Sequence, residues 1–466
     1  MNKGRVYIRT LGCPKNEADG AALTRHLKLA GWTVVDDPEC ADAEIVNTCG
    51  FIEPTKLESL EAIWEGVSRR DTDRSGRRRL VVTGCLAQRY AGDLAKEIPS
   101  VDAIVGFNRP DLVERALEAN CTGPLPVCWV EKPDAIYREH TTTWQIDTES
   151  APLSTYIKIG DGCDNACRFC AIPLIRGRLR SRPLQSIVEE VTMLVSNGTR
   201  EVILVSQDTT SWGTDLDNGT DLALLLHHID SIPGDFWVRL MYAHPAFVTE
   251  RLIASVGDCT KLVPYLDMPM QHISDRMLTI MNRHTTKVDT QRTIDALRRV
   301  RPDLAMRTTF IVGHPGETEH DFAELLTFAE ENGFERMGAF VYSTEDGTPS
   351  ARMDDVVPRE LASQRAGLLA EAFDRWSADQ SVQKLGSFVP TLLEQRSEDG
   401  CWEGRTIHDA PDIDGRIIVS GDAITAFGIY NVLVTGAEGV DLTGRCDAQH
   451  DAASGRRPSA TVGATV

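Results

Sequence analysis

Three cysteines, Cys163, Cys167 and Cys170, share one short segment in a C-x3-C-x2-C arrangement. They follow residues 155–159, whose β-branched and aromatic side chains predict a strand. A structural zinc ion takes a closed set of four ligands, whereas an iron–sulfur cube held by three cysteines keeps one iron open to a small molecule. The sequence offers no obvious fourth ligand nearby. We therefore expect an open iron–sulfur centre, with a zinc site or three unconnected thiols as the alternatives.

A second set of cysteines, Cys13, Cys49 and Cys85, is spread along the first part of the chain. Each follows a predicted strand, at residues 5–10, 44–47 and 80–83, and each has a glycine beside it. Because the carboxyl ends of parallel strands meet at one edge of a sheet, these cysteines can converge on one point. The glycines permit the tight backbone that the approach of a cluster needs. The alternative is that they are small residues at strand ends with no common role.

The elements that would position these cysteines fall into three domains, which makes the expected fold class α/β with a small all-β module. Strands and helices alternate over residues 1–119, which predicts a parallel sheet wrapped by helices. Six strand–helix units and a long closing helix over residues 154–384 predict an open or partial (β/α) barrel, with its active site at the carboxyl ends of the strands. Short strands separated by Gly, Asp and Pro over residues 386–446 predict a small antiparallel β-barrel. Residues 120–153 are interpreted as a linker and residues 447–466 as a disordered tail.

The individual elements follow from periodicity. The strands expected in the two α/β domains are residues 5–10, 33–35, 44–47, 80–83 and 103–105, then 155–159, 201–206, 237–242, 265–268, 306–312 and 337–342. Those expected in the C-terminal barrel are residues 388–394, 402–405, 416–419 and 430–435. The expected helices include residues 18–30, 54–68, 110–119, 187–197, 319–332 and 359–384.

The cysteine triplet resembles that of the radical S-adenosylmethionine enzymes. Its C-x3-C-x2-C spacing, the aromatic Phe169 before the last cysteine and its place after the first strand of a (β/α) barrel all match that superfamily. The resemblance implies a [4Fe–4S] cluster whose free iron chelates the amino and carboxylate groups of S-adenosylmethionine. An electron from the cluster then cleaves the sulfonium to give a 5′-deoxyadenosyl radical, which removes hydrogen from unactivated carbon.

The three domains together resemble the methylthiotransferases within that superfamily, from about residue 5 to residue 446. The resemblance implies that Cys13, Cys49 and Cys85 hold a second [4Fe–4S] cluster, whose open iron carries the sulfur to be inserted. It also implies two molecules of S-adenosylmethionine, one that donates a methyl group to sulfur and one that makes the radical. The C-terminal barrel is then a TRAM module. A reductase or a flavodoxin-type protein is the expected electron donor.

Local motifs favour one branch of this family. Residues 11–16 read Leu-Gly-Cys-Pro-Lys-Asn, similar to the RimO branch, which modifies the β-carbon of an aspartate in ribosomal protein S-twelve (uS12), free or in the small subunit. The tRNA-modifying branch typically carries Gln-Met in place of Pro14-Lys15. Residues 265–272 and 409–415 also resemble the RimO branch. A tRNA adenosine beside the anticodon stays an alternative substrate, and a non-catalytic iron–sulfur or zinc protein an alternative class.

Several residues at the expected barrel rim are candidates for contacts to S-adenosylmethionine or substrate. Gln207 follows the second strand and Gln271 the fourth, and the resemblance places Phe169 and Gly313 near the cofactor, Gly313 beside adenine. His244, His272 and His314 also lie at the rim, but we do not expect them to be metal ligands. Four alternating arginines are expected to share one face of an extended segment and to hold an anion; they are Arg176, Arg178, Arg180 and Arg182.

Charge and composition limit the partners. The formal net charge is −20, and residues 386–446 carry ten acidic residues against four arginines. A barrel with this charge should repel phosphate and attract a basic protein, so we expect little nucleic-acid binding; the alternative is that the acids only keep the surface soluble. No apolar run reaches the roughly 18 residues that span a membrane, and the first residues lack a secretory signal. The sequence thus predicts a cytoplasmic enzyme whose cysteines stay reduced.

Overall fold

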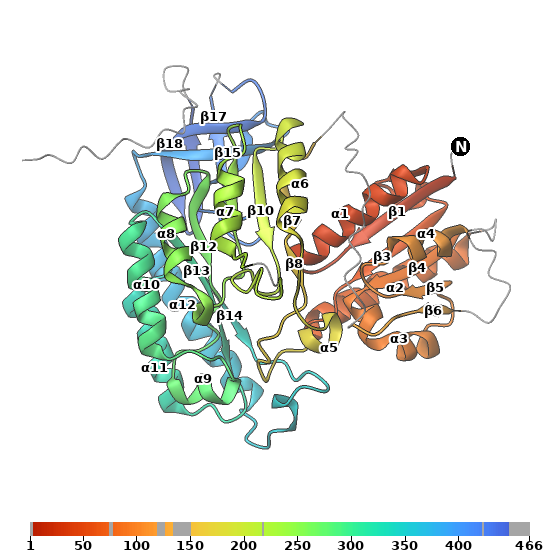
Figure 1. Ribbon diagram of the computed structural model, residues 1–466, viewed down its shortest axis with the longest axis horizontal. Coiled ribbons are helices and arrows are strands. Elements are labelled where there is room, and N and C mark those ends of the chain that lie inside the picture. Colours follow the sequence, from red (N-terminus) through yellow and green to blue (C-terminus); the bar gives the residue numbers. More distant parts are fainter. Residues whose placement is uncertain are drawn as a thin grey trace, which may run out of the picture.

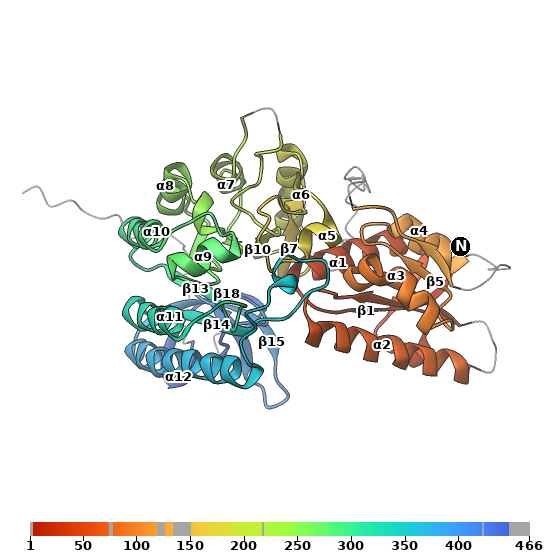
Figure 2. The same ribbon diagram turned by 90° about the horizontal axis from the view of Figure 1, so that it is seen from below.

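The computed structural model describes residues 3–73, 78–118, 126–133, 151–216, 219–421 and 424–446. An N-terminal α/β domain stands beside a central sheet, and a small barrel lies at the end of that sheet opposite helix α5 (Ile172–Arg176) (Figure 1). Both views place the N-terminal helix α1 (Pro14–Leu29) next to the first strand of the central sheet, β7 (Ser154–Lys158) (Figure 2). No helix among the described residues is long and apolar enough to cross a membrane.

The N-terminal domain contains one parallel sheet of six strands in the order β2-β1-β3-β4-β5-β6. Its strands are β1 (Gly4–Thr10), β2 (Trp32–Val35), β3 (Ala43–Thr48), β4 (Arg79–Gly84), β5 (Ala103–Val105) and β6 (Val127–Trp129). The chain passes from β1 outward to β2 and then returns to β3 on the other side of β1. Strand order therefore reverses between β1 and β3, the place where such sheets open a crevice at their carboxyl ends.

Helices cover both faces of this sheet, which is why its central strand β3 is buried at every residue. Ile45 packs toward α1 and α4 (Pro110–Glu118), whereas Val46 packs toward α2 (Glu53–Thr72) and α3 (Cys85–Glu97). The strands expected in residues 1–119 are all present. Helix α3 was not anticipated, because Gly92 and a non-helical Tyr90 interrupt its pattern.

The expected linker is wrong in one part. Residues 127–129 form β6, which pairs in parallel with β5 and completes the N-terminal sheet. A strand of three residues between prolines is too short to give a periodic sequence pattern, so it is recognised only by its pairing with β5 at the edge of the sheet. Residues 120–125 and 134–150 of the interpreted linker lie outside the described residues, as do residue 119 and the expected tail at 447–466.

The central domain is an open sheet of six parallel strands in the order β14-β13-β12-β11-β10-β7, as expected for a partial barrel. After β7 its strands are β10 (Glu201–Val205), β11 (Trp237–Leu240), β12 (Leu262–Asp267), β13 (Ala305–Val312) and β14 (Arg336–Val341). A short pair, β8 (Gly160–Asp161) and β9 (Arg180–Ser181), flanks α5. The helices are α6 (Leu184–Ser196), α7 (Leu222–Asp230), α8 (Glu250–Asp258), α9 (Asp275–Met281), α10 (Lys287–Val300), α11 (Glu319–Asn332) and α12 (Arg359–Gln383).

The two faces of the central sheet meet different partners. Val202 and Leu204 of β10 belong to the large core shared with the surrounding helices. Ile203 and Val205, which point to the opposite face, belong to a buried cluster with Leu392 and Ala410 of the C-terminal domain. The small barrel thus fills part of the inner face that an eight-stranded barrel would close by itself.

The C-terminal domain is a closed barrel in the order β15-β16-β17-β19-β18. Its strands are β15 (Phe388–Arg396), β16 (Trp402–Thr406), β17 (Ile417–Ser420), β18 (Gly428–Glu438) and β19 (Asp441–Arg445). The barrel is antiparallel as expected, except that β17 and β19 pair in parallel. Strand β19 was not anticipated, because it follows β18 after a tight turn and reads as its continuation.

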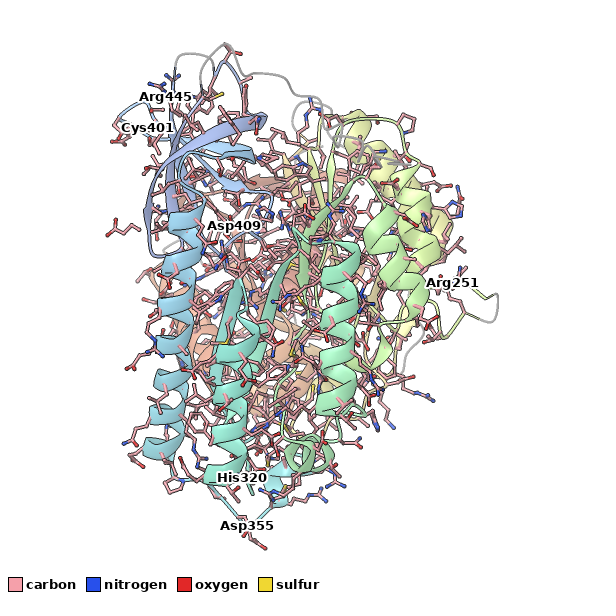
Figure 3. All side chains as sticks on the ribbon, turned by 90° about the vertical axis from the view of Figure 1, so that its left-hand side faces the viewer. Arg251, His320, Asp355, Cys401, Asp409 and Arg445 are labelled. Carbon is pink, nitrogen blue, oxygen red and sulfur yellow. The ribbon has the colours of Figure 1, made fainter. Side chains whose placement is uncertain are left out.

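Buried ion pairs join the C-terminal barrel to the central sheet. Glu201 is fully buried and accepts hydrogen bonds from Arg239 Nε at 2.8 Å and from Arg405 Nη2 at 2.6 Å. Asp409 lies beneath the C-terminal strands (Figure 3) and pairs with Arg336 of β14. Burial raises the pKa of Glu201, but the two arginines more than offset this and lower it to about 2.

We predict that Glu201→Gln lowers the melting temperature by roughly 5–10 °C, because it leaves the buried guanidinium of Arg239 without its carboxylate and leaves that of Arg405 with Glu394 alone. The pKa of Glu201 falls on folding, so its contribution is complete above about pH 4.5 and disappears as the pH falls toward about 2. Thermal melts at several pH values should therefore show a constant gap between wild type and variant above pH 5 that narrows below it. The exposed Glu331→Gln is the control. An equal gap at all pH values would contradict the assignment.

Candidate functional site

The three N-terminal cysteines lie at one edge of the N-terminal sheet. Cys13 caps α1 directly after β1, Cys49 follows β3, and Cys85 is the first residue of α3 after β4. Because β1, β3 and β4 are neighbours in the sheet, their carboxyl ends are adjacent, and the three thiols are close enough to affect one another's pKa values. Two of them also stand at helix N-termini, where the helix dipole stabilises negative charge. The site therefore suits a group bound through thiolates.

The loops that carry these cysteines are in close contact. Gly12 has a φ of +94°, and a Cβ atom there would lie 2.5 Å from Cys49 Cβ. Only glycine fits this conformation and this space, which accounts for the glycine beside Cys13. Burial raises the pKa of the Cys85 thiol to about 12, although Arg176 opposes this effect.

The second triplet lies on the loop between β8 and α5, at the carboxyl end of β7. Burial raises the pKa values of Cys163 and Cys170 to about 12. Cys167 accepts a hydrogen bond from Arg283 Nη1 at 3.5 Å, and the same guanidinium donates to Pro269 O at 2.6 Å. Arg283 was not predicted as a site residue, since it belongs to no motif and reaches the triplet only because α9 ends nearby.

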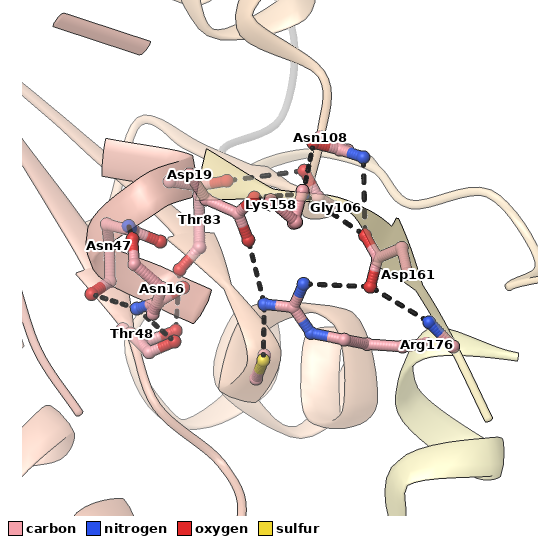
Figure 4. A network of polar contacts seen from close by, with 12 residues as sticks. Asn16, Asp19, Asn47, Thr48, Thr83, Gly106, Asn108, Lys158, Asp161 and Arg176 are labelled. Carbon is pink, nitrogen blue, oxygen red and sulfur yellow. Dashed lines mark hydrogen bonds and ion pairs between the residues drawn. The ribbon is translucent and has the colours of Figure 1, made fainter. Parts of the chain in front are cut away.

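One arginine connects the two cysteine sites (Figure 4). Arg176, only 1% exposed, donates to Asp161 Oδ1 at 3.0 Å, to Asp19 Oδ2 at 2.8 Å and to Cys85 Sγ at 3.3 Å. Asp19 belongs to α1, and Asp161 is two residues before Cys163. Lys158 completes the network by pairing with both carboxylates. Burial raises the pKa of Asp161, but Lys158 and Arg176 outweigh it and keep this pKa well below its usual range.

The expectation that four arginines share an anion-binding face is wrong. Arg176 ends a helix and Arg182 pairs with Glu190 in the interior. Arg180 donates to backbone carbonyls, and the exposed Arg178 pairs with Asp164. The segment is not one extended strand, because α5 and the short β9 divide it.

The rim residues differ in what they can offer a ligand. Both polar atoms of the Gln207 amide are buried without a hydrogen-bond partner among the described residues. Gln271 has a positive φ of 71°, and its backbone bridges to β13. Gly313 also has a positive φ, and a side chain there would collide with Ala362 of α12, so helix packing already accounts for this glycine. The Phe169 ring lies edge-on to His314 at 6.4 Å.

Each of the three rim histidines uses a ring nitrogen within the protein, although Nε2 of His244 and of His272 is buried without a hydrogen-bond partner among the described residues. His272 Nδ1 accepts from two backbone N–H groups, and His244 Nδ1 accepts from the N–H of Ala246. His314 Nε2 hydrogen-bonds Ser350 Oγ at 2.8 Å. Burial lowers the pKa of each, to about 2 for His244, 3 for His272 and 4 for His314. These rings are therefore neutral at physiological pH.

A lysine and a tyrosine that sequence reasoning did not single out as site residues meet between the domains. Lys15 Nζ lies 3.2 Å from the centre of the Tyr242 ring, which follows β11 at the carboxyl edge of the central sheet. Tyr242 has a φ of +61°, a strained conformation for a non-glycine residue. Burial lowers the pKa of Lys15. Lys15 lies in the Cys13 motif and could have been noticed there, whereas nothing in the sequence marks Tyr242.

The donor set fits iron–sulfur clusters better than a single ion. Among the described residues, no three His, Cys, Asp or Glu side chains are arranged around one metal ion. In an iron–sulfur cube each thiolate binds a different iron, so its cysteines spread more widely than the ligands of one ion. Each triplet also has an arginine hydrogen-bonded to one of its thiols, which suits an anionic cluster.

Family models match all three domains. Residues 5–106 match the Uncharacterized protein family UPF0004, residues 157–329 the Radical SAM superfamily, and residues 385–446 the TRAM domain. The radical SAM match implies S-adenosylmethionine and a [4Fe–4S] cluster. The fold also resembles that of a radical S-adenosylmethionine methyltransferase, TsrM, from Kitasatospora setae. The TM-score is 0.54 at 15% identity, covering 83% of this chain and 79% of that one, which supports the fold alone.

Curated relatives match nearly the whole chain. A ribosomal protein uS12 methylthiotransferase RimO from Anaeromyxobacter sp. (strain K) is 42% identical, covering 97% of this chain and 95% of the relative. Proteins of the same name from Geobacter sulfurreducens and Thermotoga maritima are 38% and 41% identical, covering 95% and 90% of this chain and 98% and 94% of their own. The chain therefore belongs to the RimO family of radical S-adenosylmethionine methylthiotransferases.

Proposed function

We propose that this protein replaces a hydrogen on the β-carbon of an aspartate in ribosomal protein uS12 with a methylthio group. The observation that carries the proposal is the identity of about 40%, over nearly the full length, to proteins named uS12 methylthiotransferase. Similarity restricted to the radical SAM domain would support only the chemistry. Here it includes both the N-terminal and the C-terminal domains.

Two cysteine triplets would hold the cofactors. Cys163, Cys167 and Cys170 would bind the radical-generating [4Fe–4S] cluster, and Cys13, Cys49 and Cys85 the second, sulfur-carrying one. When bound, these clusters and S-adenosylmethionine supply the hydrogen-abstracting radical, the sulfur and the methyl group. Phe169, Gln207, Gln271 and Gly313 are the proposed S-adenosylmethionine contacts. Of these, the unpartnered amide of Gln207 has the clearest capacity for a ligand.

The chain's own part is to neutralise charge, exclude water and hold the two sites together. Arg176 and Arg283 donate hydrogen bonds to Cys85 and Cys167, which offsets the negative charge of bound thiolates. Cys85 is buried, and the remaining cysteines of both sites are at most partly exposed, so the reacting atoms are shielded from solvent. The Asp19–Arg176–Asp161 ion pairs fix the N-terminal edge against the triplet loop.

The acidic C-terminal barrel supports a basic protein as the partner. The negative charge on the surface of the barrel is smaller than its composition suggests, because some of its acids are buried. Asp409 and Asp414 point inward to Arg336 and Arg307 of the central sheet. Other acids remain on the outside, among them Glu398, Asp399, Asp412 and Glu438. We propose little nucleic-acid binding at this surface and a reductase or flavodoxin-type protein as the electron donor.

The test of the function is mass spectrometry of uS12 from cells with and without this gene. We expect a methylthio mass increment on one aspartate that disappears in the deletion strain and returns with the intact gene. Cys163→Ala and Cys49→Ala variants should not restore it. An unchanged uS12, together with loss of a methylthio group from bulk tRNA, would refute the proposal in favour of a tRNA substrate.

The two-cluster assignment predicts the iron content of cysteine variants. Anaerobically reconstituted wild type should bind about eight iron atoms per chain. The triple variant Cys13→Ala, Cys49→Ala, Cys85→Ala should retain about half, and so should the triple variant at Cys163, Cys167 and Cys170. A double variant of the exposed Cys40 and Cys128 is the control and should keep the full amount. Full iron binding by either triple variant would exclude its cysteines as ligands.

Arg176 provides a second test of the N-terminal site. In protein that lacks Cys163, Cys167 and Cys170, we expect Arg176→Gln to weaken iron retention against a chelator by about 10- to 100-fold, because Cys85 loses a charged hydrogen-bond donor. The melting temperature should fall as well, since Asp161 keeps only Lys158 as a cationic partner. The matched control is the exposed Arg178→Gln. Wild-type iron retention in Arg176→Gln would contradict the proposed role.

A further inference from the structure

The ammonium group of Lys15 lies in the seam between the N-terminal cysteine site and the rim of the central sheet. Lys15 is two residues after Cys13, at the start of α1, and its Nζ lies 3.2 Å from the centre of the Tyr242 ring on the central domain. Cys13, Cys49 and Asp267 are near enough to interact with it electrostatically. A side chain of the N-terminal domain thus reaches the rim on which the second triplet also lies.

Lys15 differs from the other cations of this region because each of those has an ion pair or a hydrogen bond. Arg283 donates to Cys167 Sγ and Pro269 O. Arg176 and Lys158 share Asp19 and Asp161, and Arg307 pairs with Asp267 and Asp414. Within the described residues, Lys15 forms no ion pair and no hydrogen bond, and its one strong contact is with an aromatic ring. A partly buried ammonium group that lacks a counter-ion is costly, because burial removes water that nothing replaces. This position is therefore prepared for an anion from outside the chain.

The partner ring is held in a strained conformation. Tyr242 has a φ of +61°, and its N–H donates to Asp267 Oδ2 at 3.2 Å. Asp267 is fully buried and forms its ion pair with Arg307, so it fixes the backbone of Tyr242 but forms no ion pair with Lys15. Strain of this kind persists where the surroundings impose it, most often at binding sites. Here it keeps the aromatic face under the ammonium group.

We propose that Lys15 binds the side-chain carboxylate of the target aspartate, as a specificity-determining residue of the proposed reaction. The inference rests on the proposed function, since it takes its substrate from there. The β-carbon is bonded directly to the carboxylate carbon, so a carboxylate paired with Lys15 holds that carbon in the seam between Cys13 and the rim of the central sheet. An ammonium–carboxylate pair also rejects a neutral side chain of the same shape.

The experiment is a double-substitution cycle between enzyme and substrate. Reconstituted full-length wild type and Lys15→Met are assayed on recombinant uS12 and on uS12 whose target aspartate is changed to asparagine. We expect Lys15→Met to lower kcat/KM for normal uS12 by about 10- to 100-fold. The asparagine substrate should be impaired to a similar degree with wild type, and Lys15→Met should add less than about a twofold further loss.

Two measurements separate this role from a structural one. Lys15→Met should bind as much iron as wild type and should form 5′-deoxyadenosine from S-adenosylmethionine without uS12 at the wild-type rate. Lys28→Met, at an exposed lysine on the same helix, should match wild type on both substrates. Equal losses on the aspartate and asparagine substrates would overturn the inference. So would a raised KM for S-adenosylmethionine, because Lys15 would then hold the cofactor's carboxylate.

Failure of the proposed function gives a different result. If wild type modifies neither form of uS12 although it forms 5′-deoxyadenosine, the substrate assignment is wrong, and the inference about Lys15 falls with it. If wild type modifies uS12 and only the cycle fails, the function stands and Lys15 is not the residue that binds the carboxylate.

Discussion

A single buried guanidinium, that of Arg176, sets the relation between the two halves of the site. It is almost inaccessible to water and contacts Asp19 of the N-terminal domain, Asp161 of the triplet loop and the thiol of Cys85. Buried charges of this kind are tolerated only when every partner is in place. Together with the Arg89–Glu345 and Lys56–Glu345 pairs, this network holds the N-terminal sheet edge against the central domain.

The same device appears at the opposite end of the central sheet, where Arg405 and Arg336 connect the C-terminal barrel through Glu201 and Asp409. Apolar contacts around Leu392 and Ala410 bury surface at this junction but do little to fix the relative orientation of the two domains. The ion pairs fix this orientation, because a guanidinium and a carboxylate form strong hydrogen bonds only in a narrow range of geometries. The open six-stranded sheet is thus covered by two domains: the N-terminal domain at the rim that carries the cysteine triplet, and the C-terminal barrel along part of its inner face.

Local sequence patterns predicted most of this fold and the convergence of Cys13, Cys49 and Cys85 at one sheet edge. They succeeded for the strands of both sheets because buried parallel strands are long runs of β-branched residues, and for Cys13, Cys49 and Cys85 because strand ends share an edge. They failed where the decisive partner is distant. Strand β6 is recognised only by its pairing with β5, and the alternating arginines are separated by α5. From sequence alone Asp409 and Asp414 would be counted as surface charges, because their arginine partners lie in the distant central sheet. Arg283 and Tyr242 carry no local signal at all.

The distribution of charge links these observations to function. The chain as a whole is acidic, with a net charge of −20, yet four cations gather near the two cysteine sites: Arg176, Arg283, Lys158 and Lys15. Three of them have partners within the protein. An acidic exterior attracts a basic macromolecule over a distance set by salt, whereas an unpaired cation in a partly buried seam acts only on a group that enters it. The acidic exterior therefore attracts the substrate protein at long range, whereas Lys15 in the seam selects the reacting carboxylate at short range. That division suits a substrate protein that is basic overall and presents one carboxylate for reaction.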